Sequence, residues 1–301
     1  MFYQTRLPAI EPSDPVSALV SLTPSESKRL IAKGVAALPE VKRAMERGLI
    51  VIGRGTTNAY VAEELSGEKF ESKAAYAAGF IVDGELSAMA VAELVPVVVL
   101  RHGRRVDTAP PDALREFGEK DVSIKGASAI DAEGNVAVLA ASPESGTIGG
   151  ILPTVLARRS YLIAPVGLEK MIPSVPEACK ATGVFHFKYS TGLPVALVPM
   201  PNALVVTEIQ AFEVLTRAKA VAVGAGGIAG SEGTIVLSLT GEAGQIEKAM
   251  SLVQAIKGEP PVGRPPRRVT PAAAGFDYDA IAQWKAAAAD AKWYLPPGYA
   301  G

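Results

Sequence analysis

The feature that most constrains the fold is an apolar strand, a glycine turn and a helix that follow one another directly. Leu49–Ile52 is a short aliphatic run rich in β-branched residues, which favours a buried strand. Gly53 and Gly55 allow the backbone to turn tightly and to approach a ligand without a Cβ in the way. Thr56 and Thr57 open an amphipathic pattern, and we expect one of them to cap the helix.

The amides and hydroxyls at this helix N-terminus favour a bound anion such as a phosphate, carboxylate or pyrophosphate. The sequence therefore predicts a ligand-binding loop over residues 53–58. It does not identify the ligand. The predicted ligand-binding residues of this loop are Gly53, Arg54, Gly55, Thr56, Thr57 and Asn58.

Strands and helices alternate over residues 23–195, which predicts an α/β domain with a largely parallel sheet and helices on both faces. Further strands are expected at 121–128, 135–141 and 161–167. Ligands of such sheets bind outside the carboxyl ends of the strands. Loops 53–58, 126–131 and 144–150 all follow predicted strands, so we expect them to line one crevice.

The remaining chain divides into three predicted segments. Residues 1–22 are interrupted by prolines and read as an N-terminal arm. Residues 196–260 follow a β-α-β-β-α order, beginning with a strand at 203–206, and predict a small ferredoxin-like α+β unit. A Pro- and Ala-rich tail, 261–301, is expected to wrap its own domain or a partner subunit.

Composition excludes several classes of protein. A formal net charge of −1 gives no general attraction to nucleic acid or to an anionic membrane, and we expect no partner of either kind. A single cysteine cannot form an intrachain disulfide, which favours a reducing cytoplasm, and no targeting or membrane-spanning segment is evident. No cluster has metal-ligand spacing, and we expect no cofactor.

The aromatic tail predicts a homo-oligomer, because exposed tryptophans are costly.

Several short motifs resemble one superfamily. Residues 125–136 (KGASAIDAEGNV) resemble the Gly-Ala-Asp signature of ribose-5-phosphate isomerase, and residues 53–57 are similar to its Gly-x-Gly-Thr loop. Residues 144–147 and 161–173 resemble the lactate-utilisation (LUD) domain, locally the closest match. The resemblance covers roughly residues 25–190, in pieces. It implies the fold shared by sugar-phosphate isomerases, glucosamine-6-phosphate deaminases and CoA transferases.

The departures from that pattern limit the chemistry. The isomerases hold a carboxylate base where this chain has Ser128, and they hold a lysine after the next strand where this chain has Ala140-Ala141-Ser142. Enolisation needs a base beside the substrate carbon, so simple pentose-phosphate isomerisation is not expected. The resemblance also implies ligand contacts at Lys125, Gly126, Ser128 and Asp131, and at Ser145, Gly146 and Thr147.

Glu144 is the candidate catalytic residue, with two interpretations open. CoA transferases use a glutamate in a Glu-x-Gly-x-x-Gly setting as a nucleophile, and Glu144 has that spacing. The alternative, which we favour, is that Glu144 accepts backbone amides in an ordinary turn. The first hypothesis for the whole chain is a protein that binds a small anionic metabolite, with isomerase or acyl/CoA-transferase activity still open. The second is a non-catalytic binding or assembly protein of the same fold.

Overall fold

The structure is a computed structural model, and it describes residues 1–5, 12–187, 189–266 and 268–269. Its largest sheet has six strands: the first four in spatial order pair in parallel, the fifth pairs antiparallel with the fourth, and the sixth pairs antiparallel with the fifth. The predicted α/β class with a mostly parallel sheet is therefore confirmed. In spatial order the strands are β12 (Leu204–Val206), β10 (Tyr161–Pro165), β7 (Val122–Ile124), β2 (Leu49–Ile52), β5 (Val98–Arg101) and β6 (Arg104–Val106).

Strand β2 lies inside this sheet, and all four of its side chains are buried. Ile50 and Ile52 pack with residues of three helices, α1 (Pro24–Ala37), α2 (Pro39–Arg47) and α3 (Thr56–Ser66). Leu49 and Val51 belong to a second cluster with residues of α4 (Pro110–Glu116) and α5 (Gly146–Arg158). Successive side chains of a strand point to opposite faces, which explains why one short run supplies two core clusters.

Local sequence signals mark where the first two helices begin. The Thr23 hydroxyl accepts from the Glu26 amide at 3.4 Å, and the Glu26 carboxylate accepts from the Thr23 amide at 2.9 Å. This reciprocal pair is a capping box at the start of α1. Helix α2 begins at Pro39 and ends at Arg47, directly before Gly48.

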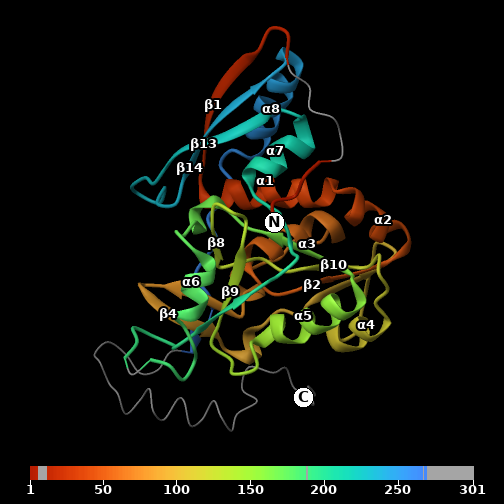
Figure 1. The fold of residues 1–301 in the computed structure, drawn as a ribbon, viewed down its shortest axis with the longest axis vertical. Helices are drawn as coiled ribbons and strands as arrows, with labels where there is room; N and C mark the ends of the chain where they lie inside the picture. Colours follow the sequence, from red (N-terminus) through yellow and green to blue (C-terminus); the bar gives the residue numbers. More distant parts are fainter. Residues whose placement is uncertain (6–11, 188, 267, 270–301) are drawn as a thin grey trace.

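A second sheet has three antiparallel strands in the order β1 (Val16–Leu22), β14 (Ile235–Gly241) and β13 (Lys219–Ala225). Helices α7 (Glu208–Thr216) and α8 (Ala243–Ile256) pack on it around Leu22, Phe212 and Leu237. Figure 1 shows this small sheet and its helices at one end of the molecule, with α1 between them and the large sheet. The glycine-rich stretch after β13 forms the hairpin connection to β14.

Two strands lie in sheets other than those expected. Residues 203–206 were assigned to the unit at 196–260, but β12 pairs in parallel with β10 of the large sheet. Its three apolar residues follow the unbroken pattern of a buried parallel strand. The third strand of the small sheet is β1, which comes from the region assigned to an N-terminal arm and pairs with β14 from Val16 to Leu22.

Two further three-stranded sheets complete the described elements. Strand β9 (Val136–Ala140) lies between β8 (Ala129–Ile130) and β11 (Ala196–Pro199), outside the large sheet, and α6 (Val175–Lys180) packs beside it. Strand β4 (Glu85–Met89) lies between β3 (Gly79–Val82) and β15 (Arg268–Val269). Short 3₁₀ helices cover Ala74–Tyr76, Val91–Glu93 and Leu168–Lys170. The part of the predicted tail from 270 to 301 lies outside the described residues.

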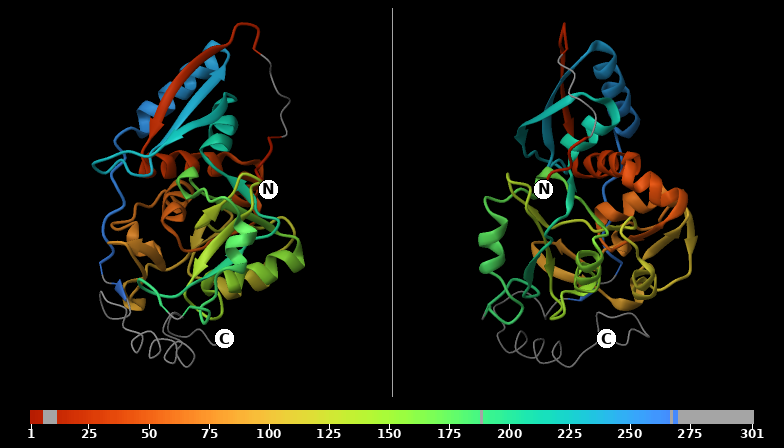
Figure 2. Two further views of the ribbon diagram at one scale, coloured as in Figure 1. Left: turned by 60° about the vertical axis from the view of Figure 1, so that its left-hand side comes forward. Right: turned by 45° about the vertical axis from the view of Figure 1, so that its right-hand side comes forward.

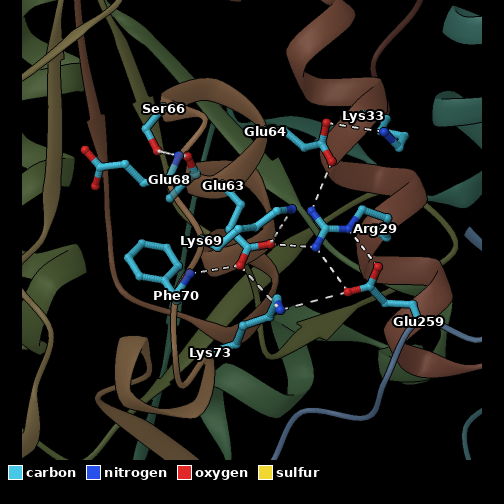
Figure 3. A network of polar contacts seen from close by, with 11 residues as sticks. Arg29, Lys33, Glu63, Glu64, Ser66, Glu68, Lys69, Phe70, Lys73 and Glu259 are labelled. Atoms are coloured by element: carbon cyan, nitrogen blue, oxygen red, sulfur yellow. Dashed lines mark hydrogen bonds and ion pairs between the residues drawn. The ribbon is translucent and has the colours of Figure 1, made fainter.

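A buried charge network links α1, α3 and the segment after α8 (Figure 3). The Arg29 guanidinium contacts Glu63 at 2.6 Å, Glu64 at 3.0 Å and Glu259 at 3.0 Å. Lys73 approaches Glu63 at 3.4 Å. Every carboxylate in the network has a cationic partner, so the network serves to hold these three segments together.

No helix in the described ranges is long and apolar enough to cross a membrane.

Candidate functional site

The candidate site lies where the four parallel strands of the large sheet end. Residues after these strands continue the main-chain pairing: the Gly53 amide donates to the Ile124 carbonyl at 2.8 Å, and the Lys125 amide donates to the Ile163 carbonyl at 2.9 Å. The carboxyl ends of β2, β7, β10 and β12 therefore meet at one edge. The loops that follow them supply the polar groups described next.

The glycine loop after β2 begins helix α3 without a side-chain cap. Gly55 is the N-cap residue, with φ of 153°, and its amide donates to the Tyr76 carbonyl at 2.9 Å. The prediction that Thr56 or Thr57 caps the helix is therefore wrong. The Thr57 hydroxyl is buried and has no hydrogen-bond partner among the described residues.

Tyr76 supports the end of β2 as well. Its hydroxyl donates to the Ile52 carbonyl at 2.6 Å and accepts from the Val98 amide at 2.9 Å. Burial raises the pKa of Tyr76 to about 12, so the hydroxyl keeps its proton. Nothing in the sequence around Tyr76 pointed to this role.

Asn58 connects the first two loops. Its side-chain nitrogen donates to the Gly53 carbonyl at 2.6 Å, while its Oδ1 is buried without a partner in the part of the chain that the structure describes. A Cβ on Gly126 would lie 3.3 Å from that Oδ1 and 3.3 Å from the Pro165 carbonyl oxygen. Glycine at 126 therefore leaves room beside an unused acceptor.

Lys125 is the central cation of the site. It is buried, and its Nζ donates to the Arg54 carbonyl at 2.7 Å. Burial, with the nearby positive charges of Lys170 and Arg54, lowers the pKa of Lys125 to about 8. A lysine buried beside two further cations is destabilised in its charged form unless an anion joins it.

Arg54 and Lys170 are held by backbone oxygens. The Arg54 guanidinium donates to the Val95 carbonyl at 3.1 Å, and Lys170 Nζ donates to the Ala127 carbonyl at 2.9 Å. Burial lowers the pKa of both side chains. None of the ion pairs found among the described residues involves Arg54, Lys125 or Lys170.

Two carboxylates lie near Lys170, and neither is paired with it. Glu169 contacts Lys28 at 3.2 Å. Glu208, fully buried at the first position of α7, accepts from the Leu168 amide at 3.0 Å. Burial, followed by the charge of Glu169, raises the pKa of Glu208 to about 7, so this carboxyl group is partly protonated near neutral pH. The cluster keeps a net positive charge.

Ser128 and Asp131 are engaged elsewhere, in the turns around β8. The Ser128 hydroxyl accepts from the Leu139 amide at 3.1 Å. Asp131 accepts from the Asn135 amide at 2.9 Å and from the Val175 amide at 3.0 Å. Burial alone would raise the pKa of Asp131, but these hydrogen bonds lower it. Both contacts stabilise protein turns, and their predicted role as ligands stays a prediction.

Glu144 is exposed in the turn before α5. Its carboxylate accepts from the Ser142 hydroxyl at 3.3 Å, and its amide donates to the same hydroxyl at 3.2 Å. A Cβ on Gly149 would lie only 2.0 Å from the Glu144 carbonyl oxygen, so the turn packs closely on α5. Glu144 therefore lies in a turn, but its carboxylate accepts from a hydroxyl and not from the backbone amides that the turn interpretation expects, and both interpretations of Glu144 stay predictions.

The residues after Glu144 form the start of α5. Ser145 is the N-cap residue in the left-handed conformation, with φ of 64°, and Gly146 and Thr147 are the first helical residues. One turn further on, Ile151 reaches the glycine loop, where its Cδ1 lies 3.4 Å from the position of a Cβ on Gly53. Helix α5 is thus a common neighbour of the loops at 53–58 and 144–147, although no hydrogen bond among the described residues joins those loops.

Sequence reasoning missed Lys170 and Glu208. Lys170 lies within the run that resembles the LUD domain, but the run was read only for its pattern. Glu208 falls within the predicted unit at 196–260, because the strand before it, β12, was not expected in the large sheet. Among the described residues, no three His, Cys, Asp or Glu side chains are grouped as metal ligands.

Comparisons of the chain with protein-family models, with curated proteins and with solved structures found no match in any of the three.

Proposed function

We propose that the protein binds a small anionic metabolite, such as a sugar phosphate, an organic acid or a CoA ester, at the carboxyl ends of β2, β7 and β10. The observation that carries this proposal is the group of Arg54, Lys125 and Lys170, two buried cations and one partly buried cation whose described hydrogen bonds go to carbonyl oxygens. Burying a charge without a counter-charge is costly, and a bound anion would relieve that cost.

The glycine loop supports the same proposal. Helix α3 has eleven residues, and its N-terminus places a partial positive charge and free amide donors beside Lys125. The buried Thr57 hydroxyl adds a donor without a partner in the described chain. A ligand hydroxyl group could donate to Asn58 Oδ1, which favours a ligand that carries hydroxyl groups over a simple ion.

The superfamily resemblance is part of this proposal. An isomerase/CoA-transferase-like arrangement, with helices on both faces of the sheet and a ferredoxin-like unit after it, would bind its ligand at the same edge of the sheet. The second candidate, a non-catalytic binding or assembly protein, is favoured by Ser128, which replaces a carboxylate base and accepts a hydrogen bond from the Leu139 amide. The first candidate requires the anion site, whereas an assembly protein does not.

The test is thermal unfolding in increasing phosphate, sulfate or a phosphorylated sugar. A ligand that binds only the folded state at 100 times its Kd stabilises by about 2.7 kcal/mol. Lys170→Gln keeps a donor for the Ala127 carbonyl but removes the charge, so we expect it to lose most of the gain in melting temperature. The matched control is Lys180→Gln, an exposed lysine paired with Glu177 on the surface. An equal response of both variants would contradict the proposal.

A further inference from the structure

An apolar cavity lies between β4 and the segment 187–195, and none of its lining residues belongs to the anion site. Its volume is about 330 Å³. This is at the lower end of the range for ligand pockets, roughly 300–1,000 Å³. The lining is mostly apolar and aromatic, and its apolar members are Leu86, Phe187, Tyr189, Pro194 and Val195.

Large apolar side chains are exposed around this cavity. Ile81 pairs with Leu86 across the β3–β4 hairpin and is 66% exposed. Phe185 is 57% exposed and Tyr189 46%. Exposed apolar side chains that gather around a cavity are typical of a surface that another segment covers.

The chain that follows α8 runs directly to this surface. Arg264 forms a bidentate pair with Asp83, in the β3–β4 turn, at 2.9 and 3.0 Å. Strand β15 then pairs antiparallel with β4, so that Arg268 lies opposite Met89 and Val269 opposite Ala88. The direction of β15 is therefore along β4 toward Leu86.

Leu86 cannot extend that pairing, because its main chain already has other partners. The Leu86 amide donates to the Thr191 carbonyl at 3.3 Å, and the Leu86 carbonyl accepts from the Leu193 amide at 2.8 Å. At Leu86 the edge of β4 is therefore occupied by the segment that lines the cavity. Figure 2 shows β15 at the end of the molecule away from the small sheet, where this segment also lies.

We propose that segment 270–301 of the same chain covers this cavity with its aromatic side chains. The segment contains Phe276, Tyr278, Trp284, Trp293 and Tyr294, and aromatic side chains bury large apolar areas. An extended chain spans about 3.3 Å per residue, so each of these side chains is within reach of a cavity lined by Leu86, which lies two positions along β4 from Ala88, the partner of Val269. The occupant is thus intramolecular, and the cavity is a docking site for the C-terminal segment.

Tryptophan fluorescence gives a direct test, because the chain has two tryptophans and both lie in this segment. In the full chain, Val195→Arg and Leu86→Arg place a charge at the cavity. We expect both variants to shift the emission to longer wavelength and to increase quenching by acrylamide. The matched control is Val221→Arg, on the exposed face of the small sheet, which should change neither property. Trp284→Phe and Trp293→Phe identify which tryptophan responds.

Hydrogen exchange in the full chain tests the proposal through substitutions in the C-terminal segment, which leave the residues that line the cavity unchanged. Replacing Trp284 and Trp293 together by alanine should speed amide exchange in segment 189–195 and leave exchange in β14 unchanged. Unchanged exchange would overturn the proposal, even if the arginine variants failed to fold. So would a wild-type emission equal to that in urea. Emission that varies with protein concentration would place the segment on a second copy and overturn intramolecular docking.

Discussion

Replacing Lys125 by methionine tests whether the site holds an uncompensated charge. Methionine keeps the length of the unbranched side chain and adapts to irregular apolar surroundings, so the packing against Gly53 is largely retained. The substitution removes the ammonium group and its one described hydrogen bond, to the Arg54 carbonyl at 2.7 Å. Stability and anion binding should therefore change in opposite directions.

The magnitude follows from the pKa of Lys125, which is about 8 in the fold against an ordinary 10.5. At 1.36 kcal/mol per pH unit this difference corresponds to about 3 kcal/mol against the charged form. The lost hydrogen bond contributes about 1 kcal/mol in the other direction. At pH 7 without an added anion, we expect the variant to be about 2 kcal/mol more stable than the wild type.

The pH dependence of stability independently checks that the charge of Lys125 destabilises the folded protein. Between pH 8 and 10.5 the unfolded chain keeps the proton of Lys125 while the folded chain releases it, so the stability of the wild type rises through this range. By pH 9.5 the advantage of the methionine variant should have fallen by about 2 kcal/mol.

Urea unfolding measures the stability of the wild type and the variant under four conditions: at pH 7 and pH 9.5, each with and without sulfate. Lys180→Met is the control for removal of an exposed lysine charge. Sulfate should stabilise the wild type and this control but not Lys125→Met. A variant that is less stable at both pH values by the same amount, and that still responds to sulfate, would refute the assignment of Lys125 as an uncompensated cation.

Four further outcomes are expected. Glu208→Gln should stabilise the protein above pH 7, by roughly 3 kcal/mol at most. The raised pKa means that the stability contributed by Glu208 is fully present below pH 4.5 and is lost as pH rises through about 7. Unfolding of the variant and the wild type at pH 5 and pH 8 measures this change in stability. Glu63→Gln should cost about 1–3 kcal/mol, because Arg29 loses one of its three carboxylate partners and keeps Glu64 and Glu259. Glu116→Gln, at an exposed pair, should cost less than about 1 kcal/mol in the same urea assay. Gly34→Ala should lower the melting temperature, at a cost of about 1–3 kcal/mol, since a Cβ there would lie 2.7 Å from Ala211. After incubation with acyl-CoA esters and trapping by hydroxylamine, mass analysis should find the peptide that contains Glu144 unmodified if Glu144 serves only the turn. A label that Glu144→Gln abolishes would establish Glu144 as a nucleophile.

Elements with strong local signals were predictable from the sequence. The apolar run at β2, the glycine turn and the helix after it lie where the pattern put them, because each depends on residues a few positions apart. The same is true of the capping box at Thr23 and Glu26. The cap of α3 was not predictable, since glycine and threonine are both accepted N-cap residues and tertiary contacts decide between them.

Strand pairings between segments far apart in the chain were harder to predict from the sequence. The apolar run of β12 is compatible with either sheet, and only its burial beside β10 assigns it. That error also hid Glu208, which follows β12 and lies beside the ends of the parallel strands only if β12 belongs to the large sheet. Lys125 was a predicted ligand residue, but its cationic neighbour Lys170 follows a different strand, and the sequence does not show which loops meet.

The pairing of β1 with β14 also sets the order in which the chain can fold. Leu22 pairs with Ile235, about 210 positions later, so β1 has no partner until most of the chain has been made. At about 5–20 residues per second, synthesis of the intervening chain takes roughly 10–40 s. During that time β1 can present its apolar residues and unpaired backbone to other chains. Contacts this distant in sequence slow folding, and we expect β1 to be the segment most exposed to misassembly during synthesis.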